Sequence, residues 1–465
     1  MLDTIVEVIS DKLYTYILIV LLIAAGIYFS FATGFVQFRR IGQQFKSILE
    51  KPTDKKGVSP FQALIVSTAS RVGTGNIIGV SSAICMGGFG SVFWMWLIAI
   101  IGSASAYAES TLAQIFKKRG KNGCYGGPAY YIEFLKLKPL AVIFTICLIL
   151  TYGFGFNMLA SYNLQSTFSS YSFYNTTYTP WIIGGIIAIL VAFCLFGGGK
   201  GIIRVTEILV PVMGIVYVLV AIAVIFMNIN ILPQIFERIF SEAFDFKAIF
   251  GGFGGSCVMY GIKRGLFSNE AGVGSAPNAS SSAEISHPAK QGLVQVLSVF
   301  IDTILICTAT AFLCMCSGVE PTESIAGAQY VQLSLQKTLG NFGPVFITIA
   351  MLLFAFTTLL GNLYYVNKGV NYLAGRELSK KATNIMHIIS SLIIFVGAGL
   401  NAGLLWNIAD ITMGLMALIN IPVILVLSKY VIGATKDYDK QLKEGKNPTF
   451  RAKDIGLNEE LDYWK

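Results

Sequence analysis

Two short segments interrupt otherwise apolar stretches of the chain and carry residue types that could bind an ion or a small charged molecule. The first contains Arg71, Gly73, Thr74, Gly75 and Asn76. Its two glycines weaken a continuous helix, and an interrupted helix leaves carbonyl groups free at the end of its first half and N–H groups free at the start of its second. The N–H groups suit a carboxylate, whereas the carbonyl groups suit a cation or an ammonium group. The alternative is that the glycines only permit close helix packing.

The second segment is a run of four glycines within five residues, from Gly251 to Gly255, followed by Ser256. This run predicts a stronger break than the first. Paired glycine-interrupted segments at corresponding positions in two halves of a membrane protein indicate the binding site of a transporter.

Two further polar side chains lie inside an apolar run. Thr357 and Thr358 usually would bond to their own helix, and the sharper interpretation makes their hydroxyls hard oxygen ligands for a small cation. Arg71 is costly inside a membrane and needs a function or an acidic partner. The acidic residues at or near apolar runs, any of which could pair with it, are Glu109, Glu207, Asp302 and Asp410.

The composition defines the elements that must position these residues. The chain has 465 residues, of which 54% are hydrophobic and only 13% are charged. Soluble proteins carry about 25% charged residues, so an integral membrane protein is indicated and a soluble one is excluded. Only two histidines are present, and no catalytic constellation is visible, so neither an enzyme nor a protein with a resident cofactor is expected.

A helix that spans a bilayer needs about 20 mainly apolar residues. The sequence predicts an all-α polytopic membrane protein with about eleven such helices. The expected spans are residues 14–36, 61–87, 90–116, 139–167, 180–196, 205–228, 243–262, 290–316, 343–371, 383–401 and 405–433.

The net charge of +9 is explained by topology. All but five of the 34 Lys and Arg residues fall on one side of the predicted membrane, and the exceptions are Lys12, Arg71, Arg238, Lys247 and Lys337. Basic loops stay in the cytoplasm, so we expect a multi-pass protein of the cell membrane with its N-terminus outside and its C-terminus inside. The charges are divided among short loops, which favours contact with the lipid bilayer and argues against nucleic acid as a partner.

The two interrupted spans lie five apart and therefore run in opposite directions. We predict an extra helix (residues 1–36), an interfacial amphipathic helix and loop (37–60), a first five-helix repeat (61–232), a second, inverted repeat (233–435) and a cytoplasmic tail (436–465).

Several motifs resemble one known family, the alanine or glycine:cation symporters. The resemblance extends from about residue 15 to 435. It is carried by Ser59-Pro-Phe-Gln-Ala-Leu64, Val72-Gly-Thr-Gly-Asn-Ile77, Gly126-Gly-Pro-Ala-Tyr-Tyr-Ile132, Arg264-Gly-Leu-Phe-Ser-Asn-Glu-Ala-Gly-Val-Gly-Ser-Ala-Pro277 and Leu353-Phe-Ala-Phe-Thr-Thr358.

This resemblance implies a leucine-transporter-like fold, with one extra helix before a five-plus-five inverted repeat that contains two broken helices. It also implies sodium-coupled import of a small neutral amino acid, alanine or glycine, by alternating access. The substrate-binding residues it implies are Thr74, Gly75 and Asn76 for the carboxylate, and Gly252, Phe253, Gly254, Gly255 and Ser256 for the ammonium group and side chain. The sodium ligands it implies are Ala69, Val72, Phe354, Thr357 and Thr358.

Two positions depart from what is common in the family. Asn362 stands where a Trp is usual, and it adds a substrate contact that suits a larger or more polar amino acid such as glutamine. Arg71 replaces a small polar residue, and with Asp302 and Glu270 it is a candidate for gating or ion pairing. The alternatives are a glutamine-preferring or proton-coupled member of the family and, from another class, an ion channel.

Overall fold

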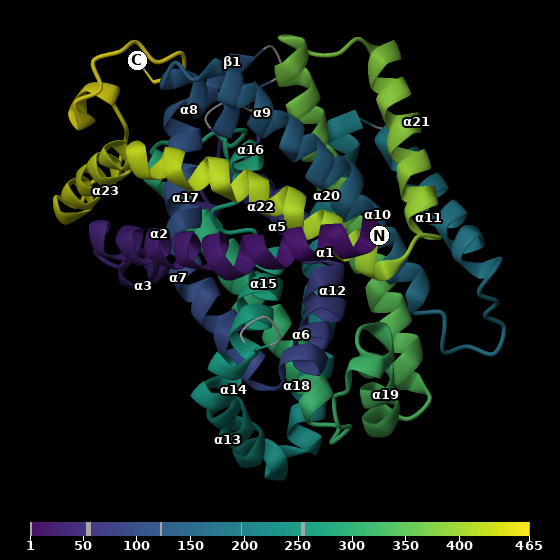
Figure 1. Cartoon of the computed structure of the whole chain (residues 1–465). Helices are drawn as coiled ribbons and strands as arrows, with labels where there is room; N and C mark the ends of the chain where they lie inside the picture. Colours follow the sequence, from purple (N-terminus) through teal and green to yellow (C-terminus); the bar gives the residue numbers. More distant parts are fainter. Residues whose placement is uncertain (1, 53–56, 121–122, 197, 253–255, 465) are drawn as a thin grey trace.

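The computed structural model describes residues 2–52, 57–120, 123–196, 198–252 and 256–464. It is built almost wholly of helices (Figure 1). Within the described residues the exception is a hairpin of β1 (Lys118–Gly120) and β2 (Gly123–Tyr125), in which Arg119 pairs with Cys124. Segments marked η are short helical turns that are wider or tighter than an α-helix.

Besides the hairpin, the first part of the chain, up to residue 227, contains these elements: α1 (Leu2–Leu13), η1 (Tyr14–Leu18), α2 (Ile19–Ala32), α3 (Val36–Arg39), α4 (Ile41–Ile48), α5 (Pro60–Arg71), η2 (Gly75–Gly79), α6 (Val80–Gly87), α7 (Gly90–Ile115), α8 (Pro128–Phe134), α9 (Lys138–Ile149), η3 (Leu150–Gly155), α10 (Phe156–Ser166), α11 (Thr179–Phe196) and α12 (Gly198–Met227).

The second part contains these: η4 (Ile229–Ile231), α13 (Leu232–Ala243), α14 (Phe246–Gly251), α15 (Cys257–Asn269), α16 (Pro277–Ser280), α17 (Pro288–Val299), η6 (Phe300–Cys307), α18 (Thr308–Met315), η7 (Glu323–Ile325), α19 (Ala328–Leu339), α20 (Phe342–Ala374), α21 (Lys380–Gly397), α22 (Ala402–Val426), α23 (Ser428–Lys443) and η8 (Ala452–Ile455).

Eight helical stretches in the described chain are long and apolar enough to cross a membrane: Thr4–Ala32, Gly90–Ile115, Lys138–Ser166, Thr179–Phe196, Arg204–Met227, Pro288–Met315, Phe342–Ala374 and Ala402–Val426. The other three expected spans correspond to helices that are interrupted, at 61–87 and 243–262, or that begin with two lysines, at α21. Whether these three also cross the bilayer stays a prediction.

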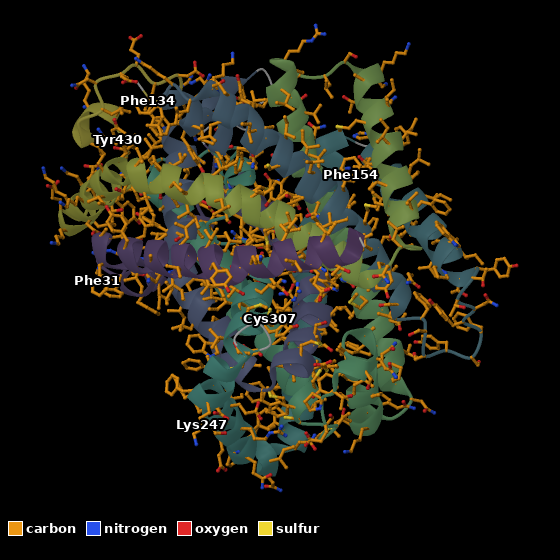
Figure 2. The ribbon with its side chains drawn as sticks, in the orientation of Figure 1. Phe31, Phe134, Phe154, Lys247, Cys307 and Tyr430 are labelled. Atoms are coloured by element: carbon orange, nitrogen blue, oxygen red, sulfur yellow. The ribbon has the colours of Figure 1, made fainter. Side chains whose placement is uncertain are left out.

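Apolar side chains cover much of the outer surface, as a bilayer requires. Phe193 of α11 is 81% exposed and Phe226 of α12 is 69% exposed. Figure 2 shows Phe31, which is 69% exposed, at the left edge of the molecule and Cys307 near the centre of the view. Exposing so many large apolar side chains to water is unfavourable, so this surface is expected to face the acyl chains of lipid. The expected amphipathic segment forms α3 and α4, where Phe38, Ile41 and Phe45 are exposed.

Helix α7 runs between two faces of the molecule, and positions along it are used below to describe depth. Its first residue, Gly90, lies against Glu242 and Ala243 of α13, and its last turn leads to β1. In Figure 1 the hairpin lies at the top and α13 at the bottom, and we call these the hairpin face and the α13 face. All eight cysteines of the chain are free.

Candidate functional site

The first interruption lies where the sequence predicts it. Helix α5 ends at Arg71, Val72 is extended with ψ 93°, and the chain resumes a helical path at η2 from Gly75. In a continuous helix the Gly73 N–H would bond to the Ala69 carbonyl. Here it donates to Oδ1 of Asn76 at 2.7 Å instead. The Ala69 carbonyl therefore loses its helical partner and becomes available to a cation.

Helix α20 packs directly onto this break. A Cβ on Gly73 would lie 1.9 Å from Oγ1 of Thr358, and a Cβ on Gly361 would lie 2.6 Å from the Ser70 nitrogen. Neither position has room for a side chain, so glycine is required on both sides of the contact. The glycines thus serve close packing as well as the break, and the two interpretations of the sequence are compatible.

The predicted cation ligands divide into two groups. The Thr358 hydroxyl is buried, faces Gly73 and has no hydrogen-bond partner among the described residues. The Thr357 hydroxyl bonds back to the carbonyls of Leu353 (3.0 Å) and Phe354 (3.1 Å). It lies 3.7 Å from the Met213 sulfur on α12. Thr358 is therefore the better donor of an unused oxygen to the break.

The predicted ligands Ala69, Val72 and Thr358 would supply oxygen atoms alone, two carbonyls from a disrupted helix end and one hydroxyl. Hard cations prefer oxygen ligands of this kind. The donor set therefore fits a small hard cation such as sodium.

The side chain of Asn76 is fully engaged in holding the break. Its Oδ1 accepts from the Gly73 N–H, and its Nδ2 donates to Oδ1 of Asp302 at 2.7 Å and lies 3.3 Å from the Cys307 sulfur. Asp302 also accepts from Ser268 (2.8 Å) and Thr303. The Asn76–Asp302 pair thus ties η2 to η6 and α15.

Two described residues of the glycine-rich segment, Gly252 and Ser256, lie between the end of α14 and the start of α15. Helix α15 begins after it, at Cys257, and its Gly261 packs on Ser91 near the start of α7. Ser256 only caps α15, by accepting from the Met259 N–H, and Gly252 is exposed with no atom within 4 Å of an added Cβ. These two residues, which were expected to contact the substrate, therefore lie at the α13 face, away from the first break, and their contact with substrate stays a prediction. Phe253, Gly254 and Gly255 lie outside the described residues.

The second interruption at mid-depth follows the end of α15. Glu270, Gly272 and Gly274 have φ values of 52°, 83° and 90°, so the chain turns through left-handed conformations before α16. A Cβ on Gly102, near the middle of α7, would lie 3.1 Å from Ala271. The sequence signal was present, because Gly272-Val273-Gly274 repeats the spacing of Gly73-Thr74-Gly75.

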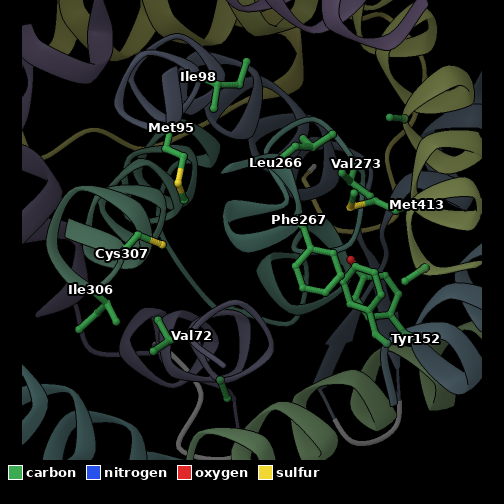
Figure 3. Packing of buried hydrophobic residues seen from close by; sticks show 14 of the residues in the cluster. Val72, Met95, Ile98, Tyr152, Leu266, Phe267, Val273, Ile306, Cys307 and Met413 are labelled. Carbon is green, nitrogen blue, oxygen red and sulfur yellow. The ribbon is translucent and has the colours of Figure 1, made fainter. Parts of the chain in front are cut away.

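The two interruptions meet. A Cβ on Gly75 would lie 2.9 Å from the Phe267 ring at the end of α15. The centroid of that ring lies 4.6 Å from that of Phe156 and 4.8 Å from that of Trp406, with the ring planes tilted in both pairs. Figure 3 shows Phe267 and Tyr152 in one part of the view and Val72 in another, and Phe156 contacts the rings of both Tyr152 and Phe267. An apolar wall therefore borders the polar break.

Arg71 lies within the charge field of three buried acids and forms none of the ion pairs found between described residues. Its Nη1 donates to Oε1 of Gln295 at 2.9 Å, and its Nε and Nη2 have no partner within the described chain. Its charge acts on Glu109, Glu270 and Asp302. Two unused guanidinium nitrogens at a buried break can donate hydrogen bonds to an anionic group such as a carboxylate.

Asp410, a candidate partner of Arg71 in the sequence analysis, pairs elsewhere. It contacts Arg264 and Lys263, each at 3.2 Å. Glu270 instead reaches the first break, because its carboxylate accepts from Ser275 (2.6 Å) and from Ser70 (3.4 Å), the residue before Arg71.

Asn362 is fully buried beside the first break. It accepts from the Ser70 hydroxyl at 2.7 Å and donates to Oδ1 of Asn157 on α10 at 3.0 Å. A second amide of α10, Asn163, donates to Thr74 at 3.2 Å. The predicted residues Thr74, Gly75 and Asn362 are therefore brought together. Ser70, Ser268 and Ser275 were missed, because single serines in apolar runs give no distinguishing signal.

Comparison with known proteins identifies relatives along the whole chain. The model of the family described as the sodium:alanine symporter family matches residues 1–452. The amino-acid carrier protein AlsT of Bacillus subtilis is 40% identical, covering 100% of this chain and 98% of the relative. The probable sodium/glutamine symporter GlnT of the same organism is 42% identical, covering 100% and 96%. The sodium/alanine symporter AgcS of Methanococcus maripaludis is 35% identical, covering 96% and 99%.

A solved structure, that of MhsT in complex with L-phenylalanine, has a similar fold. The TM-score is 0.60 at 16% identity, and the match covers 89% of this chain and 96% of the other. Identity this low establishes the fold alone. That fold is the leucine-transporter-like one that the motifs implied.

Proposed function

The chain belongs to the sodium:alanine symporter family, and from that premise we propose that it couples inward sodium flow to the import of alanine or glycine. As a member of the family it is a multi-pass membrane protein and a cation-coupled amino-acid symporter, not an enzyme and not an ion channel. Sodium is the expected coupling ion, and no resident cofactor is proposed.

The observation that carries the proposal is the contact between the first break and α20. The Gly73 N–H turns to Asn76, the Ala69 carbonyl is released, and the unpartnered Thr358 hydroxyl faces the same point. We assign the sodium ion to the Ala69 and Val72 carbonyls and the Thr358 hydroxyl, with Phe354 and Thr357 as the remaining ligands of the proposal.

The substrate is assigned to the other side of the break. Its carboxylate would meet the first N–H groups of η2, at Thr74 and Gly75, because the start of a helix favours negative charge. Asn76 would act by holding these groups, since its own amide is occupied. The ammonium group would face the second interruption, where Glu270 carries a carboxylate.

Coupling follows from differential binding. A sodium ion that bridges α5 and α20 orders the break to which the substrate carboxylate binds, so sodium raises the affinity for substrate. By linkage, substrate must raise the affinity for sodium by the same factor. Alternating access then moves the occupied site between the two faces. We place the hairpin face in the cytoplasm, because the basic loops gather on the side of the hairpin, and the N-terminus outside.

Glutamine is the second candidate substrate. The polar Asn362 lies beside the break where the family commonly has a larger apolar group, and a relative of 42% identity is named as a probable glutamine symporter. Proton coupling remains an alternative because relatives are also named sodium/proton-dependent carriers.

The test is uptake into proteoliposomes that contain the purified protein. Radiolabelled alanine, glycine and glutamine are each offered under an inward sodium gradient, with choline in place of sodium as the control. We expect accumulation of alanine or glycine only with sodium. Uptake that persists in choline, or that a pH gradient alone drives, would contradict sodium coupling, and accumulation of glutamine alone would replace the substrate.

A further inference from the structure

A second polar region lies at the hairpin face, away from both interruptions. It is a cavity of about 800 Å³ between the hairpin, the starts of α8 and α9, and the end of α20. Five basic residues and two acidic residues line it. The basic residues are Lys118, Arg119, Lys138, Lys368 and Arg376, and the acidic ones are Glu133 and Glu377.

Basic side chains outnumber acidic ones in the lining of this cavity. None of the ion pairs between described residues includes Lys118, Lys138, Lys368 or Arg376. Glu133 is already engaged as the acceptor of the Tyr372 hydroxyl at 2.8 Å. A cavity with several such cationic side chains attracts an anion that can accept several hydrogen bonds at once, and phosphate does so from both lysine and arginine.

Aromatic rings hold two of the lysines in place. The Nζ of Lys118 lies 5.3 Å from the centroid of the Tyr130 ring, and that of Lys368 lies 5.2 Å from the centroid of the Tyr364 ring. Such contacts orient a cation without neutralising its charge. Lys118 and Lys368 line the cavity from different elements, one from the hairpin and the other from α20.

The cavity lies where the apolar surface ends. Val142 of α9 lines it, and further along the same helix Ile143 is 51% exposed and Ile146 is 44% exposed. At its rim Leu373 is 42% exposed. Tyr125, Tyr130 and Tyr372 also line it, and tyrosine is typical of the membrane–water interface. An anion bound here would thus lie at headgroup depth, with an apolar helix beside it for acyl chains.

We propose that this cavity binds the phosphate headgroup of an anionic phospholipid. The phosphate lies between Lys118 and Lys368, and the acyl chains lie along the exposed apolar face of α9. A soluble phosphate compound shares the headgroup chemistry but would not use that apolar face. The lipid is therefore the source that the observations favour.

The test measures lipid binding to the purified full chain and does not depend on transport. Delipidated protein is titrated with phosphatidylglycerol and, separately, with phosphatidylcholine, and bound lipid is counted by native mass spectrometry. The double variant Lys118→Gln, Lys368→Gln is compared with Lys380→Gln, Lys381→Gln, which removes two exposed lysines at the start of α21 that do not line the cavity.

We expect tight binding of phosphatidylglycerol over phosphatidylcholine, about tenfold weaker binding in the cavity variant, and wild-type binding in the control variant. Equal binding of the two lipids, or equal loss in both variants, would overturn the site. Inorganic phosphate is the competitor that separates the sources. If millimolar phosphate displaces the lipid completely, the apolar face contributes nothing and the lipid assignment fails. A thermal unfolding curve for each variant shows that both are folded.

Discussion

Two adjacent threonines of α20 face different neighbours, although their sequence positions make them equivalent candidates for a cation site. Thr358 points at Gly73 with an unused hydroxyl, whereas Thr357 bonds to its own helix and faces Met213. The two threonines differ in side-chain direction. In the proposed cation site Thr358 is therefore the main hydroxyl ligand, and Thr357 contributes less.

We therefore expect Thr358→Ala to raise the sodium concentration for half-maximal uptake by about tenfold, which corresponds to about 1.4 kcal/mol of lost cation binding. The matched variant Thr357→Ala should raise it less, because a back-bonded hydroxyl offers the ion less. Thr358→Ser keeps the oxygen and should restore most of the affinity. The measurement is initial uptake in proteoliposomes against sodium concentration. An equal shift in both alanine variants would remove the distinction.

Asn362 controls substrate size in this proposal. Replacing it by Trp adds bulk beside Ser70 and the first break, so Asn362→Trp should raise the ratio of glycine uptake to glutamine uptake. Asn362→Leu removes the hydrogen bonds to Ser70 and Asn157 while keeping the size similar, and should leave the size preference unchanged. Competition of unlabelled amino acids against labelled alanine measures both. An unchanged ratio in the Trp variant would mean that position 362 does not border the substrate.

At the scale of elements, each interruption is held by polar side chains from other helices. Asn76 joins the Gly73 N–H to Asp302, and Glu270 joins Ser70 to Ser275. Because these groups are buried, any one of them left without a partner carries a desolvation cost of about 1–3 kcal/mol.

Asn76→Ala removes both partners at once and leaves the Gly73 N–H and one oxygen of Asp302 unsatisfied. We expect a loss of about 2–3 kcal/mol in the free energy of unfolding. Asn230→Ala, at an exposed position in η4, is the control and should be neutral. Thermal unfolding in detergent checks this. A transition temperature equal to that of the wild type would mean that Asn76 is a ligand contact and not a support of the break.

The two interruptions differ in how far the sequence could predict them. The first was placed correctly because Gly73 and Gly75 lie in the middle of an apolar run. The glycine run does coincide with the end of α14 and the start of α15, but glycine density alone does not predict depth. The structure shows that depth decides: α15 starts only after the glycine run, and its 13 residues carry the chain to mid-depth before Glu270 and Gly272 turn it. Side-chain directions, as for Thr357 and Thr358, depend on packing between distant segments and were beyond reach.

At the scale of the whole molecule, the end of the chain clasps the end of α7 on the hairpin face. Trp464 donates its indole N–H to the Gln114 carbonyl at 2.7 Å. The Lys117 ammonium group lies 3.8 Å from the Tyr463 ring centroid and donates to the Ala283 carbonyl at 2.9 Å. The tail thus joins α7 to the segment that follows the second interruption, and the stability of this contact affects both.

Burial lowers the pKa of Lys117 from 10.5 to about 8, because the ammonium group has lost its water. Between these two values the unfolded chain binds more protons than the folded one, so stability rises with pH in that interval. Raising the pH from 8 to 9 should stabilise the wild type by about 1 kcal/mol through this residue. Lys117→Met fills similar space without a titrating group and should lack that increment.

Since other groups titrate alike in both proteins, the measured quantity is the difference between their unfolding transitions at pH 7, 8, 9 and 10. That difference should change in favour of the wild type only above pH 8. If it stays constant, the attraction of the Tyr463 and Trp464 rings for the cation offsets the loss of hydration, and the clasp is held by a charged lysine across this range.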